Sequence, residues 1–214
     1  MTPLEFQREF ERLLQARNVI FQYDEKPDTE TIFGFLNLAQ LRLLKQKYIP
    51  SANTEENIIS IQNNSEDLKN LIVFNSISLS ASTYSSYTQA GSYPTDYLHY
   101  IRSDSVATVR GTSSNQIPNK LVSWKEMDKA ITNSYNTPLL RKPFIVLGER
   151  DFLITRDAYT TISSVKLTYL RRPKIMSLSQ TSELSEYLHE DIAQLAVTIF
   201  EQQRLTSNDT KRAE

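Results

Sequence analysis

The chain has 214 residues, of which 39% are hydrophobic and 23% are charged, and its formal net charge at pH 7 is -1. This composition predicts one globular core with a large excursion, and it excludes a disordered chain. The balance of 24 basic against 25 acidic residues excludes a strong overall positive field for nucleic acid, and the absence of cysteine excludes disulfides, thiolate nucleophiles and cysteine-based metal sites.

Residues 1–50 are predicted to form the N-terminal helices of a helical bundle. Thr2, Pro3 and Glu5 have the pattern of a capping box, which starts a helix that continues to about Arg17. A second helix is predicted after Asp28, because apolar residues then recur at helical spacing until the chain approaches Pro50.

Residues 51–175 are predicted to be a β-rich insertion, because short apolar runs alternate there with clusters of Asn, Ser, Thr and Pro. Val165, Leu167 and Tyr169 have the period of a strand with one buried face. The runs 144–147 and 152–154 flank a short polar stretch, which indicates a hairpin. A short helix is expected around residues 123–134, with Ser123 as its cap and Glu126 three residues further on.

Residues 176–204 are predicted to return to the bundle as a C-terminal helix, with Ser182 as its cap and with Leu188 and Ile192 on its apolar stripe. Residues 205–214 have no stripe and are expected to form a mobile tail. The predicted fold class is therefore α+β, in which amphipathic helices from both chain ends form a helical bundle and the β-rich middle is an excursion from it.

The stretch between residues 76 and 115 is dense in Ser, Thr and Tyr, and it allows two interpretations. One is a set of solvated strands and loops. The other is an inter-subunit surface, because tyrosine supplies broad amphipathic contact area and hydroxyl groups supply adaptable hydrogen bonds. The candidate contact residues are Tyr84, Tyr87, Tyr93, Tyr97 and Tyr100.

Three local groups of basic residues stand out from the balanced background, and they also allow two interpretations. In the first, they are ordinary surface charge. In the second, they contact DNA phosphates or an acidic partner through weak ionic interactions that depend on the salt concentration. These candidate contact residues are Arg141 with Lys142, Arg171 and Arg172 with Lys174, and Lys211 with Arg212.

Catalytic patterns are not found in the sequence. The four glycines form no phosphate-binding loop, and no serine lies in a nucleophile elbow. The two histidines, His99 and His189, have no spacing typical of a metal site. We therefore expect no enzyme, no catalytic or metal site and no cofactor. The enzymatic alternative, which has less support, is a metal-dependent hydrolase with a site assembled from His99, Asp96 and distant carboxylates.

The amino terminus lacks the basic start and apolar run of a signal peptide, and no stretch approaches the length of about 18 apolar residues that a spanning helix needs. We therefore expect a protein that is made in the cytoplasm and is not associated with a membrane.

Three segments resemble the ring proteins that form the neck between portal and tail in crAss-like tailed phages. They are "YPTDYLHYIRSDS", "NSYNTPLLRKPFIV" and "VKLTYLRRPKIMSLSQTSELSEYLHEDIAQLAVTIFEQQR". The resemblance covers about half of the chain, between Tyr93 and Arg204. It is carried by a Tyr-Leu-His-Tyr strand, an Asn-x-Pro-x-x-Arg-x-Pro turn, a Tyr-Leu-Arg-Arg-Pro exit and the helix that follows.

The resemblance implies a virion structural protein, a head-to-tail connector that docks on the portal and extends the DNA channel toward the tail. It further implies a homomeric ring, a homododecamer in adaptors of this kind, with further neck or tail ring proteins as neighbours and transient contact with packaged DNA. Such a protein is made in the host cytoplasm and resides in the virion neck. The alternative to the connector is an accessory or assembly protein of a capsid or tail.

Overall fold

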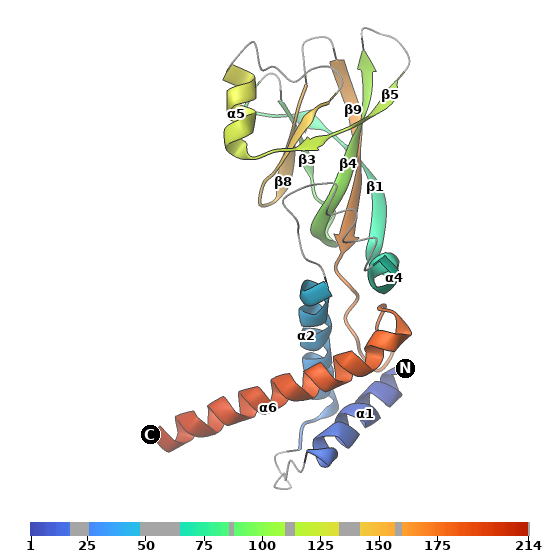
Figure 1. Cartoon of the computed structure of the whole chain (residues 1–214), viewed down its shortest axis with the longest axis vertical. Coiled ribbons are helices and arrows are strands. Elements are labelled where there is room, and N and C mark those ends of the chain that lie inside the picture. The colour runs from blue at the N-terminus through green and yellow to red at the C-terminus, as the bar shows by residue number, and fades with distance from the viewer. Residues whose placement is uncertain are drawn as a thin grey trace. The chain divides into compact units, whose positions relative to one another are not determined.

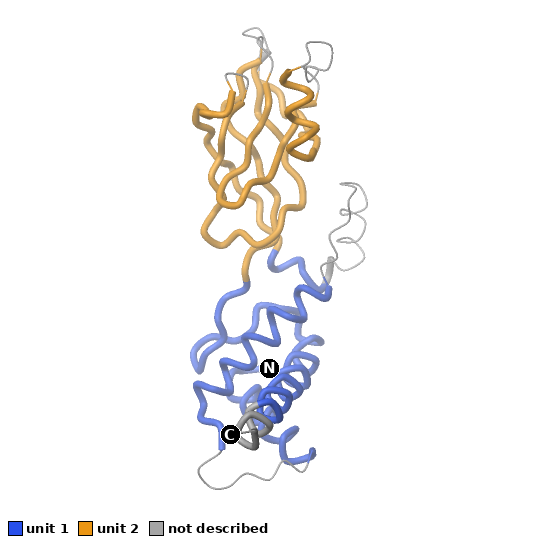
Figure 2. Tube along the Cα trace, turned by 90° about the vertical axis from the view of Figure 1, so that its left-hand side faces the viewer, with its two compact units in different colours: residues 1–50, 59–71, 173–214 blue, residues 51–58, 72–172 orange. Residues whose placement is uncertain are grey.

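The computed structural model describes residues 1–17, 26–47, 65–85, 88–109, 114–132, 142–156 and 160–213. The chain divides into two compact units, which Figure 2 colours separately. The helical unit consists of residues 1–50, 59–71 and 173–214, and the β unit consists of residues 51–58 and 72–172. The chain enters the β unit from the helical unit and returns to it.

Three long helices make up most of the helical unit. They are α1 (Pro3–Ala16), α2 (Thr29–Lys47) and α6 (His189–Ala213), and the unit also contains the short helix α4 (Ser65–Leu68) and the 3-10 turns η2 (Lys69–Leu71) and η3 (Glu186–Leu188). The predicted capping box at the start of α1 is confirmed, because Thr2 and Glu5 bond to each other's backbone amides. The ring of Phe200 on α6 meets those of Phe10 on α1 and Phe35 on α2, at 6.0 and 5.1 Å.

The last helix differs from its prediction at both ends. Ser182 does not cap it: the Ser182 hydroxyl donates to Gln40 Oε1 at 2.7 Å and accepts from the Leu184 amide at 3.2 Å, and the first helical turn begins at Glu186. At the other end α6 continues to Ala213, so residues 205–213 of the expected mobile tail are helical. The stripe ends earlier than the helix does.

Nine strands are found in the described part of the β unit, and they form two sheets. The four-stranded sheet A has the order β1-β9-β4-β5, and the five-stranded sheet B has the order β2-β3-β8-β7-β6. The strands are β1 (Ile72–Ser78), β2 (Ser80–Ala81), β3 (Thr88–Ser92), β4 (Tyr97–Val109), β5 (Asn115–Pro118), β6 (Lys120–Leu121), β7 (Phe144–Leu147), β8 (Asp151–Thr155) and β9 (Thr160–Arg171). The hairpin predicted around residues 148–151 is confirmed as β7 and β8.

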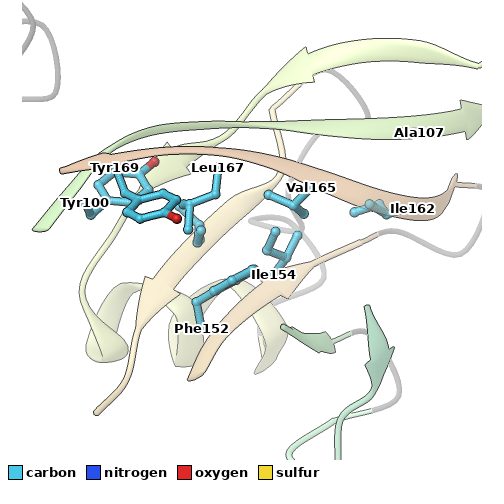
Figure 3. Close-up of a cluster of buried hydrophobic side chains, with 9 residues drawn as sticks. Tyr100, Ala107, Phe152, Ile154, Ile162, Val165, Leu167 and Tyr169 are labelled. Carbon is cyan, nitrogen blue, oxygen red and sulfur yellow. The ribbon is translucent and has the colours of Figure 1, made fainter. Parts of the chain in front are cut away.

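The core of the β unit lies between the two sheets. Figure 3 shows Phe152 and Ile154 of β8 beneath Val165 and Leu167 of β9, and all four side chains are buried. The alternation predicted for residues 165–169 therefore has its buried face on sheet B. The neighbouring residues Val146 and Leu153 point to the other side of sheet B and pack there with Met127 of helix α5 (Trp124–Thr132). Sheet B is thus covered on both faces.

Each edge strand of sheet A continues into an edge strand of sheet B after one residue. Leu79 separates β1 from β2, and Asn119 separates β5 from β6. Buried hydrogen bonds fix the second corner: Asn119 donates to Ser103 Oγ at 2.8 Å and accepts from Ser105 Oγ at 2.6 Å. A buried amide that lacked these partners would cost about 1–3 kcal/mol, so the network holds the corner in place.

The predicted fold class is wrong. The described chain is a mixed α/β structure in which strands form two sheets in the middle of the chain, with helices before and after them in sequence, and one further helix, α5, packs on sheet B. The helices from the two chain ends do not form a regular bundle, because α6 runs across α2 instead of alongside it (Figure 1). An apolar stripe commits a helix to packing, but it does not set the crossing angle.

Candidate interaction surfaces

The predicted basic groups are only partly brought together. Arg171 is the last residue of β9, and the Arg172 amide extends the same ladder by donating to the Asp96 carbonyl at 2.6 Å. Lys174 belongs to the helical unit, where its ammonium group lies 3.4 Å from the Glu183 carboxylate. That carboxylate also accepts from the Lys174 amide at 3.0 Å, so it offsets much of the local positive charge.

The remaining basic candidates give less information. Lys142 is exposed just before β7. Arg141 lies outside the described residues, as do the side chains of Lys211 and Arg212 in the last turns of α6. The described residues therefore contain no continuous basic surface built from these predicted groups.

Three of the predicted contact tyrosines belong to the β-unit core or its margin. Tyr100 is only 5% exposed, so it is not available to a partner, and this part of the predicted surface is wrong. Tyr93 and Tyr97 stack at 4.1 Å between ring centroids, and Tyr97 lies 5.7 Å from the ring of Tyr169. The β4–β9 pairing is irregular next to Tyr97 and Tyr100, and each irregularity changes the face of the sheet to which the following side chains point. A prediction that assumes strict alternation along the strand therefore assigns these side chains to the wrong face.

Asp96, named with His99 as a possible catalytic pair, has a structural contact in this cluster. Its carboxylate accepts a hydrogen bond from the Tyr169 hydroxyl at 2.9 Å. Burial, together with this anionic acceptor, raises the pKa of Tyr169 to about 12, so the phenol remains protonated and continues to donate. Among the described residues, no three His, Cys, Asp or Glu side chains gather closely enough to hold a metal ion.

Tyr84 is different from the other tyrosines, because it forms an exposed aromatic pair with Trp124. The two rings meet edge to face at 5.7 Å, both are about half exposed, and the Tyr84 hydroxyl donates to Asp128 one turn further along α5. This hydrogen bond raises the pKa of Tyr84. Rigid aromatic side chains of this kind are enriched in protein–protein contacts.

The position of Trp124 follows from the capping box predicted at the start of α5. The Glu126 amide donates to Ser123 Oγ at 3.3 Å, and Glu126 Oε2 accepts from the Ser123 amide at 2.9 Å. The cap fixes the first helical residue, Trp124, beside Tyr84. Tyr87, the other tyrosine of this region, lies outside the described residues. The sequence reasoning named Tyr84 but missed Trp124, although it is the only tryptophan of the chain.

The segment between β9 and α6 lies along helix α2 and is held there by amide side chains. Asn37 donates to the Met176 carbonyl at 3.0 Å and accepts from the Met176 amide at 2.7 Å. Its side-chain amide therefore makes the same pair of hydrogen bonds that the backbone of a neighbouring strand would make. Gln40 donates to the Lys174 carbonyl at 3.3 Å. With Met176 buried, the large apolar side chains of Ile175 and Leu178 are exposed. The sequence pattern did not single out either residue.

Strand β1 carries the most exposed phenylalanine among the described residues. Val73 and Ile77 pack against the core, so Phe74 between them projects from the opposite face of sheet A and is 74% exposed. Side chains alternate between the two faces of a strand, which places Phe74 opposite Val73. The sequence does not reveal that no other element within the described ranges covers this face at Phe74.

No helix in the described ranges has the length and apolar character that crossing a membrane requires. No protein-family model matches the chain, and no curated protein is significantly similar to it.

Proposed function

We propose that the chain is a non-enzymatic structural subunit of a tailed-phage virion, a head-to-tail connector that docks on the portal and extends the DNA channel toward the tail. The observation that carries the proposal is that both units leave large apolar side chains exposed, namely Phe74 and Trp124 in the β unit and Ile175 and Leu178 in the helical unit. Exposed apolar groups on separate parts of a chain favour contacts with more than one neighbour. The resemblance of residues 93–204 to neck ring proteins indicates that these neighbours are the portal and other ring proteins of the neck.

A connector ring requires each subunit to present two different, complementary surfaces, because a head-to-tail contact repeated about an axis closes into a ring. In the proposed assembly, about twelve copies form the ring, and the portal and further neck or tail ring proteins lie above and below it. The near-zero net charge of -1 suits a channel through which DNA must slide, since tight phosphate binding would slow its passage.

The proposal is tested in the phage whose genome encodes the chain. An amber mutation early in its gene should give DNA-filled heads without attached tails under non-permissive conditions, and a plasmid copy of the wild-type gene should restore complete particles. In wild-type particles, quantitative mass spectrometry should find the protein at about the same copy number as the portal.

Complete infectious particles from the amber mutant would overturn the proposal. Tailless heads combined with wild-type virions that lack the protein would instead identify an assembly factor, which acts during morphogenesis and then leaves. A plasmid copy that carries Ile175→Lys should complement less well than one carrying Leu4→Lys, a substitution of an exposed α1 residue that serves as the surface control.

A further inference from the structure

The edges of the two sheets differ in how well they are protected from pairing with another chain. Natural sheets protect their edges with very short strands, charged residues, proline or bulges. In sheet B the edge strands β2 and β6 have only two residues each. In sheet A the edge strand β5 has four residues and ends in Pro118. These three edges are therefore poor templates for a partner strand.

The proline of β5 lies at the position that faces away from the sheet. The Asn119 amide donates inward to the Ser103 carbonyl of β4 at 3.0 Å. Because successive residues of a strand direct their amides to opposite sides, the backbone nitrogen of Pro118 faces outward, where it has no hydrogen to donate. The outer edge of β5 thus lacks a donor that a neighbouring strand would need.

Strand β1, the other edge of sheet A, has none of these protections. Its seven residues, IVFNSIS, contain no charge and no proline, and they pair with β9 without any shift of register. Among the described residues, no strand pairs with its other side. Alternate residues of β1 therefore direct backbone amide and carbonyl groups away from the sheet, next to the exposed ring of Phe74. A regular apolar edge of this kind is a template for β-sheet extension.

We propose that β1 pairs with β1 of a second copy of this chain, antiparallel and about a two-fold axis. A second copy offers three other sheet edges among its described residues, and all three are short or blocked, so its β1 is the edge that can return the full set of hydrogen bonds. Two-fold pairing of identical strands is antiparallel by symmetry. The two sheets A then form one continuous eight-stranded sheet across the contact.

The sequence of β1 is complementary to itself in one register. With Asn75 opposite its own copy, Val73 lies opposite Ile77 on the face that packs against the core, and Phe74 lies opposite Ser76 on the outer face. The two Phe74 residues are then diagonal neighbours, about 7–8 Å apart between backbones and within reach of each other's rings. This register uses all seven residues and covers the exposed side chain.

A two-fold contact cannot be the repeated contact of a cyclic ring, because it closes on itself after two copies. The paired form is therefore the state of the free chain, in which the β1 edge is covered before assembly. The inference rests on the β1 edge and on Phe74, whereas the connector proposal also rests on Trp124, Ile175 and Leu178, so either can fail while the other holds.

The first test is the mass of the purified full-length chain by sedimentation equilibrium. We expect a reversible dimer with a dissociation constant on the order of 10 µM, since a single strand pair is a contact at the small end of protein interfaces. Phe74→Lys should raise this constant at least about tenfold, because it places two like charges next to the axis. Ile175→Lys is the matched control: Ile175 is 75% exposed, as Phe74 is 74% exposed, but it lies in the other unit.

The second test uses the absence of cysteine from the chain, which makes any introduced thiol unique. Asn75→Cys alone should form a cross-linked dimer under mild oxidation or with a short bismaleimide, and Gln116→Cys on β5 alone should not. A monomer at about 200 µM, twenty times the expected constant, would overturn the inference, as would a dimer that Phe74→Lys leaves unchanged. A mixture of the two cysteine variants that yields mainly mixed cross-links would also overturn it and would indicate head-to-tail pairing of β1 with β5.

Discussion

Gly91 on β3 allows a close contact with the core that can be tested by adding one methyl group. Gly91 lies directly opposite Phe152 of β8, and the phenylalanine ring covers it. A Cβ atom at position 91 would lie 2.7 Å from Cε2 and 3.0 Å from Cε1 of that ring, and closer still to Cζ. Phe152 is fully buried between the sheets (Figure 3), so its ring can move away only by displacing other core side chains.

Gly91→Ala should therefore destabilise the β unit. Overpacking a core with one methyl group costs about 1–3 kcal/mol. The lower entropy of an unfolded chain that has alanine in place of glycine offsets about 0.4–1 kcal/mol. The net loss then lies between about 0 and 2.6 kcal/mol, and its central value of about 1.3 kcal/mol lowers the melting temperature of a unit of this size by roughly 5–10 °C.

The assay is urea unfolding followed by tryptophan fluorescence. The single tryptophan, Trp124, lies on α5 in the β unit, so its signal reports the unfolding of that unit. Gly34→Ala is the matched control: Gly34 lies inside α2 with nothing within 4 Å of an added Cβ, so the same substitution should stabilise the helical unit by about 0.5–1 kcal/mol.

A second substitution isolates the contact itself. Phe152→Leu should be less harmful in the Gly91→Ala background than in the wild type, with a coupling of at least about 0.5 kcal/mol, because the smaller side chain relieves the overlap. If Gly91→Ala leaves the fluorescence midpoint unchanged or raises it, the packing of β3 on the core is different from the one described.

Three further predictions concern the helical unit. Ile192→Asp should cost about 3 kcal/mol or more, because it places an unpaired charge at a fully buried position of α6; a loss below about 1 kcal/mol by circular dichroism would show that the stripe is not core. Asn37→Ala should cost about 1–3 kcal/mol and accelerate hydrogen exchange at the Met176 amide, which loses its acceptor; unchanged exchange would contradict the contact. Burial, and secondarily the α-amino group of Met1, lowers the pKa of His189, so the folded state binds fewer protons than the unfolded chain, and stability should fall as the pH drops through about 6.5. His189→Gln should reduce the change of the urea midpoint between pH 7.5 and 5.5. A wild-type midpoint that rises on acidification would refute this assignment.

Features that depend on residues close together in the chain could be predicted from the sequence. The capping boxes at Thr2 and Ser123 each need two residues three positions apart, and both form as expected. The β7–β8 hairpin and the buried face of β9 also follow from local patterns of apolar and turn residues.

Features set by distant partners could not be predicted. Ser182 has the residue type of a helix cap, but its hydroxyl is used by Gln40, which lies 142 positions earlier in the chain. The segment around Met176 is held by Asn37, 139 positions away, and this contact leaves Ile175 and Leu178 exposed. The burial of Tyr100 depends on irregular pairing between β4 and β9, which cannot be recognised from the residue types of the two strands.

The crossing of α6 over α2 is a further example, because the same stripes of leucine and isoleucine would serve a parallel bundle equally well.

The exposed surfaces depend on what the rest of the fold fails to cover. Phe74 and Trp124 are ordinary core residue types by sequence, and their exposure is known only once the sheets are placed.

A reconstruction of the assembled particle at subunit resolution would test the proposed connector role. A connector subunit should appear there as a closed ring of copies at the head-to-tail junction, in contact with the portal, with apolar surfaces of both units facing neighbours. Density for this chain elsewhere in the particle, or a neck fully accounted for by other proteins, would contradict it.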